Sequence, residues 1–218
     1  MGYRLEVIGK KNIDFRLYLI TDRKLVTRYA SLIMAVRQAL KGGIKAIQLR
    51  EKDMGTRDLL QLAYKIRSLT AEYGAKLFIN DRFDIALAVG ADGVHLTQRS
   101  IPVSHVRDIV KKRLLIGVST HDMKEAAEAE KGGADFITFG PVYRTPSKLR
   151  YGKPVGVDAL KRINKKMNIP VFAIGGINNS RIKDVRESGA HGAAMIREVL
   201  ASDDIKRKSQ ELINLLGD

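Results

Sequence analysis

The chain has 218 residues, of which 44% are hydrophobic, and it carries a formal net charge of +15. This length is typical of one globular domain, and the hydrophobic share excludes a disordered chain. No apolar segment approaches the roughly 20 residues that span a bilayer, the N-terminus lacks the apolar core of a secretory signal, and the absence of cysteine excludes disulfides.

Eight short apolar segments alternate along the chain with longer segments of helical periodicity. The short segments are rich in Ile, Val, Leu and Phe, which is typical of parallel strands covered on both faces. Between them, apolar residues at spacings of three and four predict a helix over 57–73, and a further helix is predicted over 122–131. The predicted strands are 17–22, 46–51, 76–81, 93–97, 114–120, 136–141, 171–176 and 192–196.

A glycine-containing phrase recurs before every second predicted strand, as KGGIKAIQL, VGADGVHL, KGGADFITF and SGAHGAAMI. Such repetition indicates a barrel built from quarter units. We therefore predict an α/β protein with one (β/α)8 TIM-barrel domain over 1–218, including an N-terminal extension over 1–15 and a closing helix over 203–216. The competing doubly wound sheet would carry a GxGxxG turn after the first strand, where LYLITDRK stands.

Polar side chains collect where the predicted strands end, whereas the strand starts carry small or apolar residues. Barrels of this kind perform their chemistry at the carboxyl ends of the strands. Because several cations brought together need anionic partners, we predict that this rim binds phosphorylated small molecules. The polar residues are Thr21, Asp22, Gln48, Arg50, Glu51, Lys52, Asn80, Asp81, Arg82, Gln98, Arg99, Ser100, Ser119, Thr120, His121, Thr145, Ser147 and Lys148.

The last two predicted strands carry the pattern of a phosphate site. In AIGGI, Gly175 and Gly176 let backbone N–H groups approach a ligand, and a following helix N-terminus adds partial positive charge. Barrels commonly place a phosphate site after these two strands. We predict phosphate binding by Gly175, Gly176, Ile196 and Arg197.

Six phrases in order carry a family resemblance: YLITD, IQLREK, FINDRFDIALAVGADGVHL, IGVSTH, FGPVYRTPSK and AIGGI. Over about 17–200 the chain resembles the thiamine phosphate synthases and the related thiazole tautomerases. Resemblance to the synthases implies a transferase of thiamine biosynthesis. It joins 4-amino-2-methyl-5-(diphosphooxymethyl)pyrimidine to a thiazole phosphate and yields thiamine phosphate and pyrophosphate. The diphosphate leaves first, so the site must stabilise its charge and exclude water.

The resemblance also implies roles for residues in the matching phrases. Lys148 would be catalytic and stabilise the leaving group, so its loss should cost on the order of 10²–10³ in rate. Asp81 would hold Mg²⁺ that bridges diphosphate oxygens, and Arg50 and Lys52 would lie against the diphosphate. The other substrate-binding residues implied are Gln48, Glu51, Asn80 and Ser119 for the pyrimidine diphosphate, and Thr145 and Ser147 for the thiazole phosphate.

Two positions depart from the family pattern. After the fourth strand the phrase is TQRS, so Ser100 stands where the synthases have a second magnesium carboxylate. One carboxylate, substrate oxygens and water can still hold Mg²⁺, and Arg99 could supply part of the missing positive charge. The family serine at the end of the eighth strand is Arg197 here, and a guanidinium there could strengthen phosphate binding.

Two other functions stay open. A tautomerase would use His121 as its catalytic acid–base group and would need no magnesium carboxylates, which agrees with Ser100. A regulator that binds nucleic acid is permitted by the charge, but the chain shows no RNP, KH or zinc-finger pattern. The synthase is favoured by residues that a tautomerase, which has no leaving group, does not need: Arg50, Lys52, Asn80, Asp81 and Lys148.

The charge excess has three interpretations: a nucleic-acid surface, attraction of anionic substrates, or solvated helix surfaces as in many heat-adapted proteins. We expect phosphorylated small-molecule substrates, no membrane association and no specific nucleic acid. The simplest location is the cytoplasm. The oligomeric state stays open, with a homodimer as one arrangement.

Overall fold

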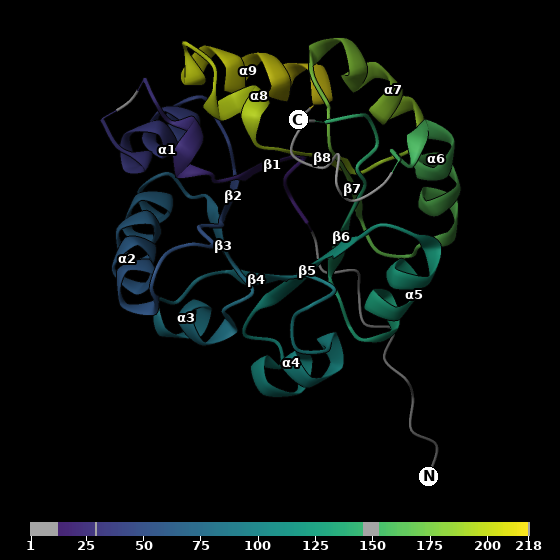
Figure 1. Ribbon diagram of the computed structural model, residues 1–218, viewed down its shortest axis with the longest axis horizontal. Helices are drawn as coiled ribbons and strands as arrows, with labels where there is room; N and C mark the ends of the chain where they lie inside the picture. The colour runs from purple at the N-terminus through teal and green to yellow at the C-terminus, as the bar shows by residue number, and fades with distance from the viewer. Residues whose placement is uncertain (1–12, 29, 146–152, 218) are drawn as a thin grey trace.

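The computed structural model of the protein describes residues 13–28, 30–145 and 153–217. Its strands form a closed barrel surrounded by helices, as Figure 1 shows. Each strand pairs in parallel with the next in the chain, and β8 pairs with β1, which confirms the predicted (β/α)8 TIM barrel. The strands are β1 (Leu17–Ile20), β2 (Ala46–Leu49), β3 (Lys76–Asn80), β4 (Gly93–Leu96), β5 (Leu115–Thr120), β6 (Phe136–Phe139), β7 (Val171–Ile174) and β8 (Gly192–Met195).

Helices connect the strands along the outside of the barrel. Polar side chains mark where several of them begin: Ser31, Asp122 and Asp204 each accept a hydrogen bond from a backbone N–H three residues later. The helices are η1 (Arg23–Leu25), α1 (Leu32–Lys41), α2 (Thr56–Glu72), α3 (Phe83–Ala88), α4 (Val103–Val110), α5 (Met123–Lys131), α6 (Gly156–Lys166), η3 (Asn179–Arg181), α7 (Ile182–Glu187), α8 (Arg197–Leu200) and α9 (Ile205–Leu216). None of those described is long and apolar enough to cross a membrane.

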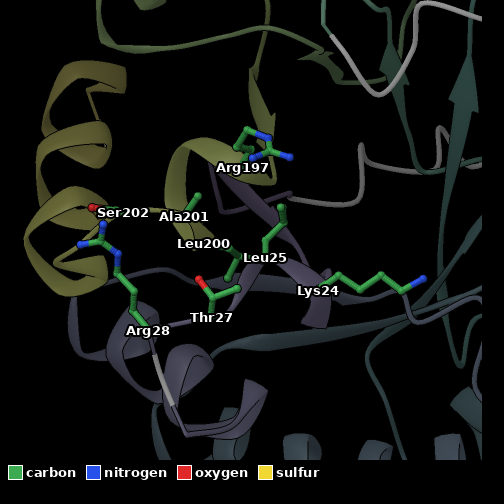
Figure 2. Close-up of a pocket in the computed structure, with 8 residues that line it drawn as sticks. All are labelled: Lys24, Leu25, Thr27, Arg28, Arg197, Leu200, Ala201 and Ser202. Atoms are coloured by element: carbon green, nitrogen blue, oxygen red, sulfur yellow. The ribbon is translucent and has the colours of Figure 1, made fainter.

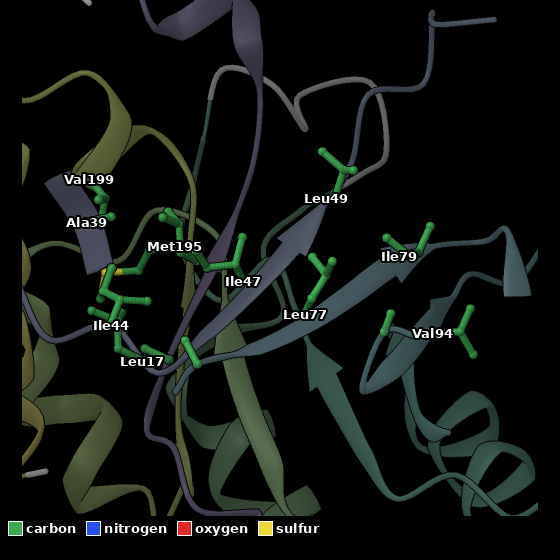
Figure 3. Packing of buried hydrophobic residues seen from close by; sticks show 14 of the residues in the cluster. Leu17, Ala39, Ile44, Ile47, Leu49, Leu77, Ile79, Val94, Met195 and Val199 are labelled. Carbon is green, nitrogen blue, oxygen red and sulfur yellow. The ribbon is translucent and has the colours of Figure 1, made fainter. Parts of the chain in front are cut away.

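Successive side chains of each strand point to opposite faces of the sheet, which divides the core into two clusters. In β1, Leu17 and Leu19 pack outward against the helices, whereas Tyr18 and Ile20 lie inside the barrel. Figure 3 shows side chains of the outer cluster, among them Ala39 of α1, Val199 of α8 and aliphatic residues of β2, β3 and β4. The same alternation decides which strand residues point into the barrel.

Aromatic side chains fill the interior below the carboxyl ends of the strands. Phe15 stacks on Phe172 with ring centroids 5.2 Å apart, so the end of the predicted N-terminal extension contributes to the core. Glycines leave room for these rings. A Cβ on Gly93 would lie 2.4 Å from the Phe78 ring. We call this layer the aromatic floor; it consists of Phe15, Tyr18, Phe78, Phe136 and Phe172.

Candidate active site

Alternation places three predicted substrate-binding residues on the inner face of the barrel. In β2, Ile47 and Leu49 pack outward, so Gln48 lies inside and is 1% exposed. The same pattern directs Asn80 of β3 and Ser119 of β5 inward. Three strands therefore bring polar groups to one interior near their carboxyl ends.

Cations from the loops after β2 and β4 gather near Asp81, which follows β3. The pKa of Lys52 is lowered by burial and then by the charges of Arg50 and Arg99, while the charge of Asp81 acts to raise it. These side chains are thus close enough to influence one another. We call Arg50, Lys52 and Arg99 the cation group. Because like charges repel, the group suits a ligand with several negative charges.

Glu51, predicted to bind substrate, lies in a different environment. Its Oε1 accepts a 2.7 Å hydrogen bond from Thr21 Oγ1, and both of its oxygens accept from the Arg23 backbone N–H at 3.2 Å. Thr21 Oγ1 in turn accepts a 2.9 Å bond from the Arg50 backbone N–H. The buried carboxylate therefore joins the loops after β1 and β2, and its contact with substrate stays a prediction.

Asp81 has a left-handed backbone, with φ of 66°. This conformation costs a non-glycine residue roughly 1–2 kcal/mol, and such residues concentrate at functional sites. Its N–H donates to the His95 carbonyl at 2.9 Å, which ties the loop to β4. No cluster of three potential metal ligands occurs within the described ranges. One carboxylate still fits a Mg²⁺ ion that takes its other ligands from a diphosphate and water.

Ser100 uses its hydroxyl within the turn after β4. Ser100 Oγ accepts a 2.8 Å hydrogen bond from the Thr97 backbone N–H and lies 3.1 Å from Thr97 Oγ1. The Arg99 N–H also lies 3.3 Å from Thr97 Oγ1. The residue that replaces the family carboxylate therefore stabilises the turn that carries Arg99.

A buried histidine, which the sequence patterns do not single out, links the aromatic floor to the mouth. His95 Nε2 lies 3.0 Å from Ser119 Oγ, and His95 Nδ1 lies 3.4 Å from the Tyr18 hydroxyl. Burial, and then the charge of Arg50, lower the pKa of His95 to about 3. The ring is therefore neutral at pH 7. A polar residue at an inward position of the strand GVHL could have indicated it.

His121 lies at the start of α5, where it pairs with Glu125. The His121 backbone N–H donates to Glu125 Oε2 at 2.7 Å, and His121 Nδ1 lies 3.0 Å from the same oxygen. Asp122 accepts a 2.8 Å bond from the Glu125 N–H. Glu125 therefore reaches back over the helix N-terminus as in a capping box, which gives His121 a structural role in that cap.

Gly175 and Gly176 both have positive φ angles, of 99° and 66°. A Cβ on Gly175 would lie 2.6 Å from Pro141 Cβ, and one on Gly176 would lie 2.9 Å from the Arg144 carbonyl oxygen. The loop after β6 thus packs directly on both glycines. This close approach requires glycine independently of the predicted phosphate contact.

Tyr143 fastens the loop after β6 to η3 and α7. Its hydroxyl donates to Asp184 Oδ2 at 2.9 Å, and the Arg181 guanidinium lies 4.5 Å from its ring centroid. Burial and the contact with Asp184 raise the pKa of Tyr143 to about 12. The anchored loop leads to Thr145, which is half-buried. Ser147 and Lys148, the remaining predicted residues of this loop, lie outside the described residues.

Arg197 lines a hollow of about 340 Å³ between the connection after β1 and the segment after β8 (Figure 2). Two other cations line it, and both have acidic partners: Lys24 Nζ lies 2.9 Å from Asp53 Oδ2, and Arg28 pairs with Asp203. Gly175 follows β7, and Arg197 and the half-buried Ile196 follow β8. Because β7 and β8 are neighbours, these predicted phosphate-binding residues follow adjacent strands.

Similarity to known proteins extends over nearly the whole chain. Residues 17–199 match the family model for thiamine monophosphate synthase. A Geobacter sulfurreducens protein is 50% identical over 204 residues, covering 94% of this chain and 95% of its own. The thiamine-phosphate synthase of Clostridium novyi is 43% identical over 204 residues, covering 94% of this chain and 100% of its own.

A solved structure agrees with these sequence matches. The thiamine phosphate pyrophosphorylase from Pyrococcus furiosus superimposes with a TM-score of 0.85 at 38% identity, covering 93% of this chain and 96% of its own. Sequence and structure therefore point to one family. The chain belongs to the thiamine monophosphate synthase family.

Proposed function

We propose that the protein is a thiamine-phosphate synthase, which joins 4-amino-2-methyl-5-(diphosphooxymethyl)pyrimidine to a thiazole phosphate and releases pyrophosphate. The proposal rests on the meeting of the cation group with Asp81 at one end of the barrel. A diphosphate gains negative charge as its bond to carbon breaks, and preorganised cations stabilise that charge. The names of the Clostridium and Pyrococcus relatives support the same activity.

The residues of the chain divide the work of the proposed reaction. Gln48 lies inside the barrel, where its amide offers both a donor and an acceptor to a pyrimidine ring. The cation group holds the diphosphate. Glu51 keeps the backbone of Arg50 in place through Thr21. The aromatic floor excludes water from below the reacting carbon.

Magnesium is part of the proposal. Asp81 would hold the ion together with diphosphate oxygens and water, and the bound ion would neutralise charge on the departing pyrophosphate. The carboxylate lies within electrostatic range of Lys52, which places it beside the group proposed to hold the diphosphate. Ser100 adds no carboxylate, so the ion would depend on the substrate for most of its ligands.

The isomerase alternative is not supported. The named relatives are synthases. The names of the relatives describe enzymes, which favours an enzyme over a regulator that binds nucleic acid. The phosphate contacts of Gly175, Gly176, Ile196 and Arg197, the homodimer and the cytoplasmic location stay predictions.

The proposed function is tested by supplying both substrates with and without Mg²⁺. We expect release of pyrophosphate only when both substrates and the metal are present, and a large loss in Asp81→Asn. The absence of release, beside an active control enzyme, would remove the proposal. Metal-independent isomerisation of a thiazole carboxylate phosphate that disappears in His121→Ala would establish the tautomerase instead.

A further inference from the structure

Tyr18, His95 and Ser119 form a chain of hydrogen bonds from the aromatic floor to the mouth of the barrel. Tyr18 and His95 are buried, and Ser119 is half-buried. The three residues come from β1, β4 and β5, so the chain crosses the interior. Gly117 leaves room for it, because a Cβ there would lie 2.6 Å from His95 Nδ1.

The surroundings of Tyr18 fix the direction of these bonds. Within the described part of the chain, the Tyr18 hydroxyl has one hydrogen bond, the 3.4 Å contact with His95 Nδ1. A buried hydroxyl without an acceptor is costly, so this O–H donates to Nδ1. The rings around that of Tyr18, which offer no conventional acceptor, belong to Phe15, Phe78, Phe136 and Phe172.

The direction of the hydrogen bond between Tyr18 and His95 determines the direction of the hydrogen bond between His95 and Ser119. A neutral imidazole whose Nδ1 accepts a bond carries its proton on Nε2. His95 Nε2–H therefore donates to Ser119 Oγ across 3.0 Å. Gln98 Nε2 donates to the Ser119 carbonyl at 2.7 Å, which holds the backbone of the same residue. The hydroxyl proton of Ser119 is then directed to some other acceptor.

We propose that His95 is a positioning residue: Tyr18 fixes its Nε2–H tautomer, and His95 orients the Ser119 hydroxyl to donate to the pyrimidine diphosphate. The identity of the acceptor rests on the proposed synthase function. The tautomer and the direction of the bonds do not depend on it. The two parts therefore need different measurements.

The tautomer can be measured without any activity. The chain has four histidines, so ring ¹⁵N signals of histidine-labelled protein can be assigned with a His95→Gln variant. We expect His95 to show a protonated Nε2 and an accepting Nδ1, and we expect Tyr18→Phe to shift the Nδ1 signal. A protonated Nδ1 in the unmodified protein would overturn the proposal, whether or not the protein is a synthase.

A double-mutant cycle tests the action through Ser119. Tyr18→Phe removes the hydroxyl and keeps the ring, so we expect kcat to fall about 3- to 10-fold, the range of one hydrogen bond. In a Ser119→Ala background the same change should cost nothing further. Additive losses would contradict the proposal. Tyr64→Phe, on the exposed face of α2, is the matched control and should keep full activity.

Conservative rescue separates positioning from packing. The side-chain amide of His95→Gln can still donate to Ser119, whereas His95→Leu cannot. We expect the glutamine variant to retain at least several-fold more kcat than the leucine variant at similar KM. Equal kcat in two folded variants would overturn the proposal. If the leucine variant does not fold, the ¹⁵N measurement and the double-mutant cycle still decide it.

Discussion

Lys52 offers a residue whose protonation can be followed by kinetics. Burial and the charges of Arg50 and Arg99 lower its pKa, so its positive charge is lost at a lower pH than that of an exposed lysine. KM for the pyrimidine diphosphate should therefore begin to rise on the alkaline side. The rise should move to higher pH in Lys52→Arg, because a guanidinium stays protonated.

Steady-state KM measured between about pH 7 and 10 checks this expectation. Lys65→Arg, at an exposed position of α2, provides the matched control and should leave the profile unchanged. An alkaline limb that is identical in Lys52→Arg would show that another group causes it.

Substitution of Ser100 by aspartate tests whether a second carboxylate tightens magnesium binding. Aspartate at this position can still accept the hydrogen bond from the Thr97 N–H. We expect Ser100→Asp to lower the Mg²⁺ concentration at half-maximal rate by roughly tenfold, since affinity for such ions rises with ligand charge. Titration of the rate with Mg²⁺ measures this. Ser100→Asn has the same shape without the charge, and an equal effect in both variants would contradict the explanation.

The sequence indicates which residues occupy the rim, but not what each side chain contacts. Gln48, Arg50 and Asp81 could be identified because each follows or ends an apolar segment. The role of Glu51 depends on Thr21, which follows the neighbouring strand β1. The bond between His95 and Ser119 likewise depends on the register between β4 and β5, which the order of residues along the chain does not specify.

At the scale of elements, the predicted strands mostly start correctly and end too late. The predicted segment 46–51 ends as β2 at Leu49, and 171–176 ends as β7 at Ile174. Residues beyond these points leave the ladder to form loops. At Gly175 the cause is backbone conformation, because its positive φ is incompatible with a strand. Apolar composition alone does not reveal where the backbone turns.

The second glycine after β7 allows the cost of conformation to be separated from that of contact. Gly74 has φ of 62° and open space where a Cβ would lie, with no other atom within 4 Å, whereas Gly176 has φ of 66° and a close neighbour in Tyr143. We expect Gly74→Ala to lower the free energy of unfolding by about 1–2 kcal/mol. Gly176→Ala should cost about 2–5 kcal/mol, because overpacking adds to the strain.

Urea denaturation of both variants measures the difference. Gly176→Ala should also raise KM for the thiazole phosphate, since the displaced loop carries Thr145. Equal losses of stability in the two variants would mean that the loop after β6 moves to accommodate the added Cβ with no further loss of free energy of unfolding.

At the scale of the whole molecule, the net charge of +15 should draw anionic substrates toward the mouth. KM for the pyrimidine diphosphate should rise several-fold between about 0.05 and 0.3 M salt, with little change in kcat. Arg99→Gln should weaken this dependence. Lys165→Gln should leave it unchanged, because Lys165 lies in the last turn of α6, at the opposite end of the barrel. Equal slopes in both variants would exclude local attraction by the cation group.

The aromatic floor has a consequence for how substrates enter and products leave the enzyme. Buried rings of Phe15, Tyr18, Phe78, Phe136 and Phe172 obstruct the barrel along its axis. Two substrates must arrive, and two products must depart, by one shared opening. The product that dissociates more slowly blocks this opening to the next substrates, so the order of product release governs the rate of the next turnover.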